Sequence, residues 1–276
     1  MTVRIFHCII NFTAGTPEAF LNNKELIRGN FMTAYSYPSS SRRFGLSGST
    51  LKIIAIVTMF IDHSGATIVK ELLKLPAIKA DAQTYTMVSD LYSLMRDIGR
   101  IAFPIFCFLL VEGFLHTRNV KKYASRLFLF ALISEIPFDF ALKPSWYYPE
   151  KQNVYFTLLI GLLVIWGMSL FLEQDMMLIL IMVAGLIAAR LLKTDYSYKG
   201  VFLIEVLYVL RFSRLYQCLG GAAAVTWELP APAAFFPVYF YNGKRGISLK
   251  YFFYWFYPVH LILLGIVTKY VLPMFA

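Results

Sequence analysis

The chain has 276 residues, of which 58% are hydrophobic and only 15% are charged, whereas a typical soluble domain is about 25% charged. This composition excludes an ordinary soluble protein and predicts an all-α, polytopic integral membrane helical bundle. The net charge of +10 fits loop lysines and arginines that orient helices beside anionic lipid, and it also fits a basic cradle for a polyanionic ligand such as a nucleotide. No basic low-complexity tract or recognition motif indicates binding of nucleic acid.

The N-terminal arm, residues 1–45, differs from the rest of the chain. Its apolar start is too short and too polar to span a bilayer, and it lacks the small-residue cleavage pattern of a signal peptide. A Ser/Arg-rich stretch, SYPSSSRRFG, follows. We expect this arm to be poorly ordered or to lie at the membrane interface, and residues 46–276 to form one membrane domain.

Three cysteines, Cys8, Cys107 and Cys218, are scattered along the chain. Their spacing contains no CxxC pair, so it indicates neither a disulfide framework nor a zinc–thiolate site. Cys107 lies in an apolar segment and is interpreted as a packing residue, because no local base would activate it as a nucleophile.

Residues 51–69 form the first predicted membrane helix, with Asp62 and His63 near its middle. Ionisable groups at that depth cost about 2.5–3.5 kcal/mol each to insert, so they are retained for a function or through pairing inside a bundle. Adjacent residues of a helix do not face each other, so we expect no hydrogen bond between these two side chains. Asp62 therefore needs a partner on another helix. An ion pair with Arg100 would supply one, and either Arg96 or Arg100 could balance the buried carboxylates.

A polar loop is predicted over residues 70–97 and a second helix over residues 98–116. Pro104 predicts a kink that could free backbone carbonyls toward a cavity. Charged residues stand in pairs, one turn apart, near both ends of this helix, and a basic turn follows it. These residues are Arg96, Arg100, Glu112, His116, Arg118, Lys121 and Lys122.

The third predicted helix covers residues 121–142. Glu135 and Asp139 lie one turn apart near its end, with Pro137 between them. A lipid-facing helix would not tolerate two carboxylates at this position, so we expect both to face the bundle or a watery cavity.

Five further helices complete the prediction of about eight transmembrane helices, with a range of seven to nine. The fourth and fifth are nearly free of charge and are interpreted as scaffold, whereas prolines in the seventh predict a broken or kinked span. A tight turn presents Lys244 and Arg245 just before the last helix, which contains His260. The five ranges are 154–172, 176–192, 200–215, 219–241 and 251–272.

The rise of about 1.5 Å per residue places several ionisable groups at one depth if the helices alternate in direction. Measured from the start of the first helix, Asp62 and His63 lie about 17–18 Å in, Glu135 about 21 Å and His260 about 16–17 Å. We therefore expect these four side chains from three helices to share one level in the bilayer.

Five sequence blocks resemble the TraX family: LKIIAIVTMFIDHSGA, DIGRIAFPIFCFLLVEGFLHTRNVKKY, RLFLFALISEIPFDFAL, YNGKRG and YFFYWFYPVHLILL. The resemblance covers residues 46–276; it is long and specific in the first three helices and generic in helices four to six. The family is named for the conjugative protein that acetylates the N-terminus of F-type pilin. It is similar to a wider superfamily of transmembrane acyltransferases, in which an intramembrane histidine on the first conserved helix is the expected catalytic residue.

This resemblance implies that His63 is the general base of an acyltransferase and that acetyl-CoA or another acyl-CoA is the donor. It implies a bacterial cytoplasmic (inner) membrane location, and it leaves the acceptor open among a pilin-like protein, a glycan and a small amine. A histidine suits a base because its unperturbed pKa is near 6.5, and Asp62 would set up the site around it. We expect no metal.

Charged residues are assigned to two further roles. The basic side chains would hold the phosphates of the donor, although they could instead serve only to orient the helices. The others would bind substrates or balance buried charge. The first group is Arg118, Lys121, Lys122, Lys244 and Arg245; the second is Arg96, Arg100, Glu112, His116, Glu135, Asp139 and His260.

Three alternatives remain open on sequence grounds. Buried carboxylates, histidines and proline-broken helices also build proton-coupled carriers, but those usually show an inverted repeat and none is detectable here. A structural partner of a larger membrane machine would tolerate loss of His63. A metal site is disfavoured because no HExxH or short ligand spacing occurs; its ligands would be Glu112, His116, Asp62, His63 and His260. Lysines and arginines are nearly balanced between the two sets of loops, so the membrane orientation is left open.

Overall fold

The computed structural model describes residues 45–248 and 250–275. Regular structure in this part of the chain is helical, as predicted, apart from two isolated β-bridges. The prediction for the N-terminal arm falls outside the described residues except at residue 45. Among the described residues, three helical stretches are long and apolar enough to cross a membrane, and a shorter apolar helix accompanies them: Gly48–Leu72, Ala82–His116, Tyr251–Met274 and, shorter, Val154–Leu170.

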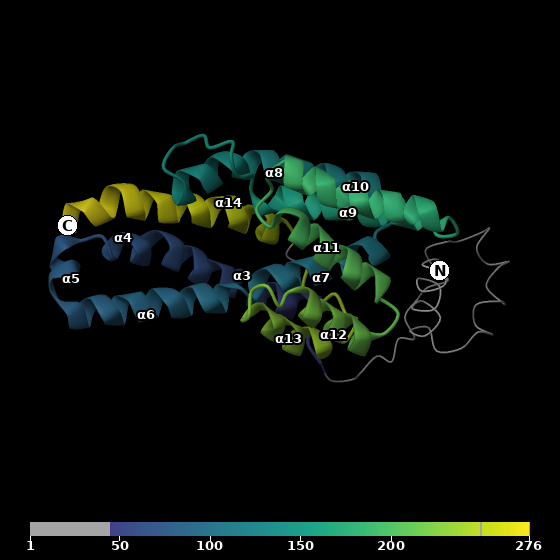
Figure 1. Cartoon of the computed structure of the whole chain (residues 1–276), viewed down its shortest axis with the longest axis horizontal. Helices are drawn as coiled ribbons and strands as arrows, with labels where there is room; N and C mark the ends of the chain where they lie inside the picture. Colours follow the sequence, from purple (N-terminus) through teal and green to yellow (C-terminus); the bar gives the residue numbers. More distant parts are fainter. Residues whose placement is uncertain (1–44, 249, 276) are drawn as a thin grey trace.

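The helices form an elongated bundle in which most axes run along the long dimension (Figure 1). At one end, α4, α5, α6 and the helical turns η4 and η5 after α14 extend beyond the other helices, and α9 and α10 reach toward the opposite end. In chain order the elements are α3 (Gly48–Ser64), η2 (Gly65–Val69), α4 (Lys70–Leu72), α5 (Pro76–Ala80), α6 (Ala82–Gly99), α7 (Ala102–His116), α8 (Val120–Leu142), α9 (Val154–Leu170), α10 (Asp175–Leu191), α11 (Ser197–Val209), α12 (Arg214–Ala224), η3 (Ala231–Ala234), α13 (Phe235–Tyr239), α14 (Lys250–Ile266), η4 (Val267–Val271) and η5 (Leu272–Phe275).

The predicted polar loop over residues 70–97 is wrong, because α6 occupies most of it. Asp81 begins this helix: its carboxylate accepts hydrogen bonds from the Thr84 hydroxyl and from the backbone N–H groups of Gln83 and Thr84, which lower its pKa. A short turn at residues 100–101 joins α6 to α7, so the stretch Ala82–His116 has 35 residues. At about 1.5 Å per residue this stretch is about 52 Å long, far longer than the ~30 Å hydrocarbon layer. Residues 82–99 are too polar to stand out as a membrane helix in the sequence, although most of them are compatible with a helix.

The seventh predicted helix, residues 219–241, is interrupted as its prolines indicated. The chain forms α12, then a turn, then the short elements η3 and α13. Pro230 caps η3 and Pro232 lies within it. Pro104, by contrast, falls in the first turn of α7, where a missing backbone N–H is tolerated; the bend lies just before it, at residues 100–101.

Helices α9, α10 and α11 pack closely against one another, and α9 carries no charged side chain. Glycines bring their backbones together: a Cβ on Gly161 would lie 2.3 Å from Ile204 Cδ1, and one on Gly185 would lie 2.2 Å from Val164 Cγ2. Both distances are far below contact distance, so larger residues would separate these helices. This packing supports the interpretation of the fourth and fifth predicted helices as scaffold.

Candidate active site

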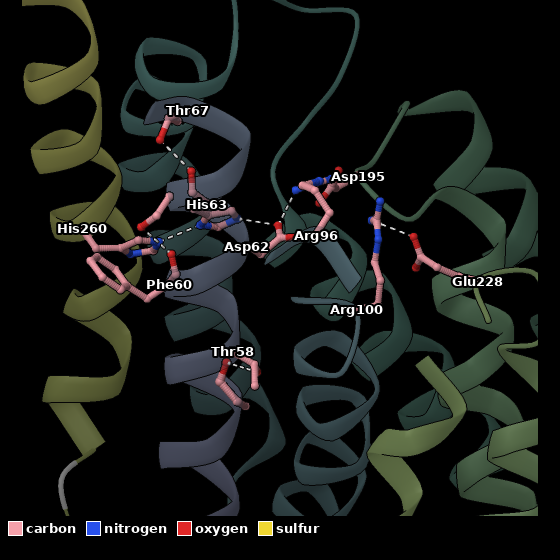
Figure 2. Close-up of polar contacts among 12 residues, drawn as sticks. Thr58, Phe60, Asp62, His63, Thr67, Arg96, Arg100, Asp195, Glu228 and His260 are labelled. Carbon is pink, nitrogen blue, oxygen red and sulfur yellow. Dashed lines mark hydrogen bonds and ion pairs between the residues drawn. The ribbon is translucent and has the colours of Figure 1, made fainter. Parts of the chain in front are cut away.

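Asp62 and His63 lie in a cluster of polar side chains where α3, α6 and α14 meet (Figure 2). The distance from His63 Nε2 to Asp62 Oδ2 is 4.0 Å, too long for a hydrogen bond. Asp62 instead pairs with Arg96 of α6, whose Nη1 lies 2.6 Å from Oδ2. The structure thus confirms that the two neighbours do not hydrogen-bond and that Asp62 has a partner on another helix.

The predicted pairing of Asp62 with Arg100 is wrong. Arg100 Nη1 lies 2.6 Å from Oε1 of Glu228, in the segment between α12 and η3. The reason is the orientation of α6: its residues Met95 and Arg96 lie against Gly65, the first residue of η2 after α3. Arg100 comes one turn later, where the chain bends into α7, and therefore reaches a different carboxylate.

Gly99 sets the distance between α6 and α3 at the site. A Cβ added at Gly99 would lie 2.1 Å from Asp62 Cβ and 2.3 Å from Asp62 Oδ1, so any side chain there would displace Asp62. Among the described residues, Asp62 Oδ1 is buried and has no hydrogen-bond partner. Asp62 therefore holds one oxygen on Arg96 and keeps the other available.

His63 and His260 face each other across α3 and α14. Their rings are nearly coplanar, and His63 Nδ1 lies 2.7 Å from His260 Nε2. The predicted common level of these two histidines is therefore confirmed. His260 Nδ1 in turn lies 2.7 Å from the carbonyl oxygen of Phe256, one turn earlier on α14.

This chain of hydrogen bonds assigns the protons on both neutral rings. A carbonyl oxygen only accepts, so His260 Nδ1 carries a hydrogen and donates it to Phe256. His260 Nε2 then has a lone pair and accepts from His63, which must carry its own hydrogen on Nδ1. The remaining nitrogen, His63 Nε2, is left with a free lone pair, as a general base requires.

A cavity of about 70 Å³ adjoins these groups. Asp62 and His63 line it together with residues of α7, α9 and α14 and with the connection that precedes α11. Because Val154 begins α9 and Tyr196 precedes α11, the site lies level with the starts of α9 and α11. The cavity is lined by Met59, Asp62, His63, Gly99, Ala102, Phe103, Phe106, Val154, Tyr155, Leu158, Asp195, Tyr196, Phe253 and Tyr257.

Asp195 is a cavity residue that sequence reasoning missed. It lies in the connection between α10 and α11, and its Oδ1 accepts from Lys151 Nζ at 2.7 Å. A parallel bridge between Gln152 and Thr194 further joins this connection to the one between α8 and α9. No sequence signal identified Asp195, because it stands in a short polar loop whose neighbours in space come from other parts of the chain.

A second, larger cavity of about 480 Å³ opens beside the first. Its cations are Lys52 of α3, Arg126 of α8 and Arg245. Backbone hydrogen bonds hold the turn that carries Arg245 against the start of α3, from Gly48 N to Lys244 O at 2.8 Å and from Ser49 N to Arg245 O at 3.0 Å. Other lining residues include Phe106, Leu109, Leu110, Glu112, Gly113, His116, Tyr123, Leu127, Tyr155, Leu158, Tyr241, Phe253 and Tyr254.

Glu112 and His116, both predicted as site residues, line this larger cavity. Glu112 Oε1 pairs with Arg214 Nη2 at 3.2 Å, while His116 Nδ1 lies 2.8 Å from the Glu112 carbonyl oxygen. Of the five residues predicted to hold donor phosphates, Arg245 lines the cavity. The other four are exposed and line neither cavity: Arg118, Lys121, Lys122 and Lys244.

Glu135 and Asp139 line neither of the two cavities. Glu135 Oε2 accepts from the side-chain amide and the backbone N–H of Asn153, at 2.5 and 3.2 Å. Asp139 is buried and accepts from the backbone N–H of Tyr148 at 2.7 Å. Both carboxylates thus fasten the connection from α8 to α9, and their assignment to substrate binding stays a prediction. Within residues 45–248 and 250–275, no three histidine, cysteine or acidic side chains are grouped to hold a metal ion.

Comparisons with known proteins place the chain in a family. The family model described as TraX protein matches residues 47–268. A protein of Dichelobacter nodosus named "Probable fimbrial assembly protein FimC, serogroup H1" is 30% identical, over 81% of this chain and 96% of its own length. No solved structure matches. Since the family model covers most of the chain, including α3, α6 and α14 around His63, this protein is a member of the TraX family.

Proposed function

We propose that this protein is a membrane-embedded acyltransferase, most specifically an acetyltransferase, that moves an acyl group from acyl-CoA to an amine or hydroxyl. The observation that carries the proposal is the hydrogen-bond chain from His63 through His260 to the Phe256 carbonyl. It leaves His63 Nε2 unprotonated beside a small cavity, which in turn adjoins a larger cavity with three cations. A base, a reaction chamber and an anion-binding vestibule are the three parts that such a transfer requires.

The reaction follows from these positions. The acceptor's nitrogen or oxygen attacks the thioester carbonyl while His63 Nε2 takes its proton; the carbonyl–sulfur bond then breaks, and the imidazolium returns the proton to the departing CoA thiolate. Asp62, 4.0 Å away, stabilises the transient imidazolium, and His260 holds the ring in place. The unpartnered Oδ1 of Asp62 can also accept a hydrogen bond from the incoming acceptor. General-base help of this kind is typically worth about 10²–10⁴-fold in rate.

The larger cavity would receive the donor. Phosphate groups are bound best by arginine and lysine through charge-assisted hydrogen bonds, and Lys52, Arg126 and Arg245 supply such cations around its wall. The exposed basic residues of the α7–α8 turn would attract the same polyanion from solution. Coenzyme A is here a substrate and leaves after each turnover.

The bilayer, the acceptor and the location belong to the same proposal. All eight predicted helices have helical counterparts, and α8 and α10 expose rows of large apolar side chains such as Leu129, Leu132, Leu180 and Ile187. Such surfaces are expected toward lipid, which supports a place in the bilayer; we propose eight spans and the bacterial inner membrane. The name of the Dichelobacter relative supports a pilin-like protein as the acceptor, with a glycan or a small amine as the other candidates.

The test is release of CoA from acetyl-CoA, with ethanolamine as an acceptor that offers both an amine and a hydroxyl, by purified protein in detergent and by membrane vesicles that contain it. We expect His63→Ala and His63→Gln to lose at least 100-fold in kcat while they still bind acetyl-CoA. Ser64→Ala is the matched control, because the Ser64 hydroxyl bonds to the Phe60 carbonyl of its own helix and lines neither cavity.

Two outcomes would contradict the proposal. Wild-type protein that is folded but releases no CoA in either preparation would favour a carrier or a structural role. Equal turnover by His63→Ala and wild type would remove His63 from the chemistry.

A further inference from the structure

The two cavities at the site share part of their walls. Phe106 of α7, Tyr155 and Leu158 of α9, and Phe253 of α14 line both the 480 Å³ cavity and the 70 Å³ cavity. Because each of these side chains borders both spaces, the four form the boundary between the basic vestibule and the chamber of His63. We call these four residues the constriction.

Several contacts fix the constriction in place. The Tyr155 hydroxyl donates to the Tyr254 carbonyl at 3.3 Å, and its ring packs edge-on against Tyr257 at 5.2 Å. Leu158 is buried. The Lys52 ammonium lies 5.3 Å from the centre of the Phe253 ring, so one cation of the vestibule stands directly at the boundary.

The composition of the boundary is informative. The four side chains of the constriction are aromatic or aliphatic. Ionisable groups lie on either side of them: Lys52 lines the vestibule, and Asp62 and His63 line the chamber. An apolar wall of this kind passes a slender neutral arm more readily than a charged group. A donor held by its phosphates in the vestibule would therefore deliver only its uncharged end to His63.

We propose that the constriction selects the length of the transferred acyl group, admitting two- and three-carbon groups to the chamber of His63 and excluding longer chains. This inference rests on the proposed acyl transfer. The chamber has 70 Å³ and the vestibule 480 Å³, so the pantetheine arm fits the vestibule and the acyl group must fit the chamber. On this measure a cavity needs about 10–15 Å³ for each water molecule, so the chamber has room for about five to seven small heavy atoms. These must include the thioester carbonyl and the attacking end of the acceptor as well as the acyl chain.

The expected ratio of kcat/KM between acyl groups follows from the effect of one methylene in a tight apolar pocket. One extra methylene changes kcat/KM by about 10–200-fold. Wild-type protein should therefore use acetyl-CoA and propionyl-CoA at rates within that range of each other and should use butyryl-CoA and hexanoyl-CoA far more slowly. Phe106 is the wall residue of choice for mutation, because it is only half-buried and its truncation opens the chamber without emptying the core.

The experiment measures CoA release from acetyl-, propionyl-, butyryl- and hexanoyl-CoA, with ethanolamine present as a surrogate acceptor that offers both an amine and a hydroxyl. Phe106→Ala should raise the butyryl-to-acetyl ratio of kcat/KM by at least tenfold. Leu109→Ala is the matched control, because Leu109 lies on the same helix and lines the larger cavity but not the chamber; its ratio should stay within twofold of wild type. Phe253→Leu opens the same boundary from α14 and serves if Phe106→Ala does not fold.

The failure of this inference and the failure of the proposed function give different results. No CoA release from any thioester by wild-type protein contradicts acyl transfer itself. Turnover of acetyl-CoA with a ratio that neither Phe106→Ala nor Phe253→Leu changes, or that Leu109→Ala changes equally, contradicts the constriction and leaves acyl transfer in place. A wild type that prefers butyryl-CoA to acetyl-CoA also overturns the selection of short chains.

Discussion

Two regions of the bundle are held together by different forces. Where α3, α6 and α14 meet, the contacts are an ion pair between Asp62 and Arg96 and a hydrogen bond between His63 and His260. Where α9, α10 and α11 meet, the contacts are apolar and close, as between Gly185 and Val164. The first region is specified by the pairing of polar groups, the second by shape.

The difference indicates that one region carries the chemistry and the other mainly supports the fold. Polar groups inside a membrane bundle weaken it unless every group is paired, so the site region tolerates few substitutions that leave a partner behind. In the α9–α11 region the close contacts are set by shape, with the buried Glu205 of α11 as a polar exception, and Tyr155 and Leu158 of α9 line the site. Substitutions in the two regions should therefore separate stability from chemistry.

The largest effect on stability is expected from breaking the ion pair on one side only. Arg96→Leu leaves Asp62, whose side chain is 15% exposed, without its partner, and we expect a loss of about 3 kcal/mol, the lower end for buried pairs because Arg96 is partly exposed. The double variant Asp62→Leu/Arg96→Leu should recover most of this loss. Unfolding by SDS in mixed micelles measures both; a double variant no more stable than Arg96→Leu would mean that the pair does not determine stability here.

An intermediate effect compares the two regions directly. Gly99→Ala and Gly185→Ala each insert a methyl group where only about 2 Å is available, and each should destabilise the fold by about 1–3 kcal/mol. Only Gly99→Ala moves Asp62, so only this variant should lose turnover per folded molecule. Thermal unfolding together with CoA release, normalised to folded protein, separates the two results. Equal loss of specific activity in both variants would remove the distinction between the regions.

The smallest effect is expected at His260, which acts through His63. His260→Phe keeps the ring packing against Phe256 but removes the acceptor for His63 Nδ1. We expect kcat for CoA release to fall about tenfold, or about 1.4 kcal/mol, with KM nearly unchanged, as for residues that orient a catalytic group. His260→Gln, which retains an acceptor, should recover part of the rate. A variant with altered KM and unchanged kcat would instead place His260 in substrate binding.

The sequence predicted the central pair of the site but not its surroundings. Helix spacing and alternating direction were enough to bring His63 and His260 to one level, because both lie in strongly apolar helices whose ends are well marked. The partner of Asp62 could not be predicted, since α6 is too polar to be recognised as a helix and its orientation decides between Arg96 and Arg100. Asp195 was missed because contacts between connections depend on tertiary packing alone.

The same limit applies to the basic residues. Clusters such as Lys121 and Lys122 stand out in the sequence, but the structure exposes them away from both cavities. Lys52 and Arg126 do line the larger cavity. Lys52 lies within α3, and Arg126 comes one turn after Lys122 in α8, so the position of a cation on its helix, and not the density of charge in the sequence, decides whether it reaches the cavity.

The turn of α3 directly after the site residues is a π-helix, η2, from Gly65 to Val69. A π-turn accommodates an additional residue without breaking the helix, and it changes the rotational phase of everything beyond it by about 100° relative to a continuous α-helix. Thr67 within η2 donates to the His63 carbonyl at 2.6 Å. The π-turn therefore determines which faces the residues of α4 present relative to the part of the helix that carries His63. Deleting one residue here would turn Lys70 and Glu71 to new faces of the helix while the catalytic half kept its own.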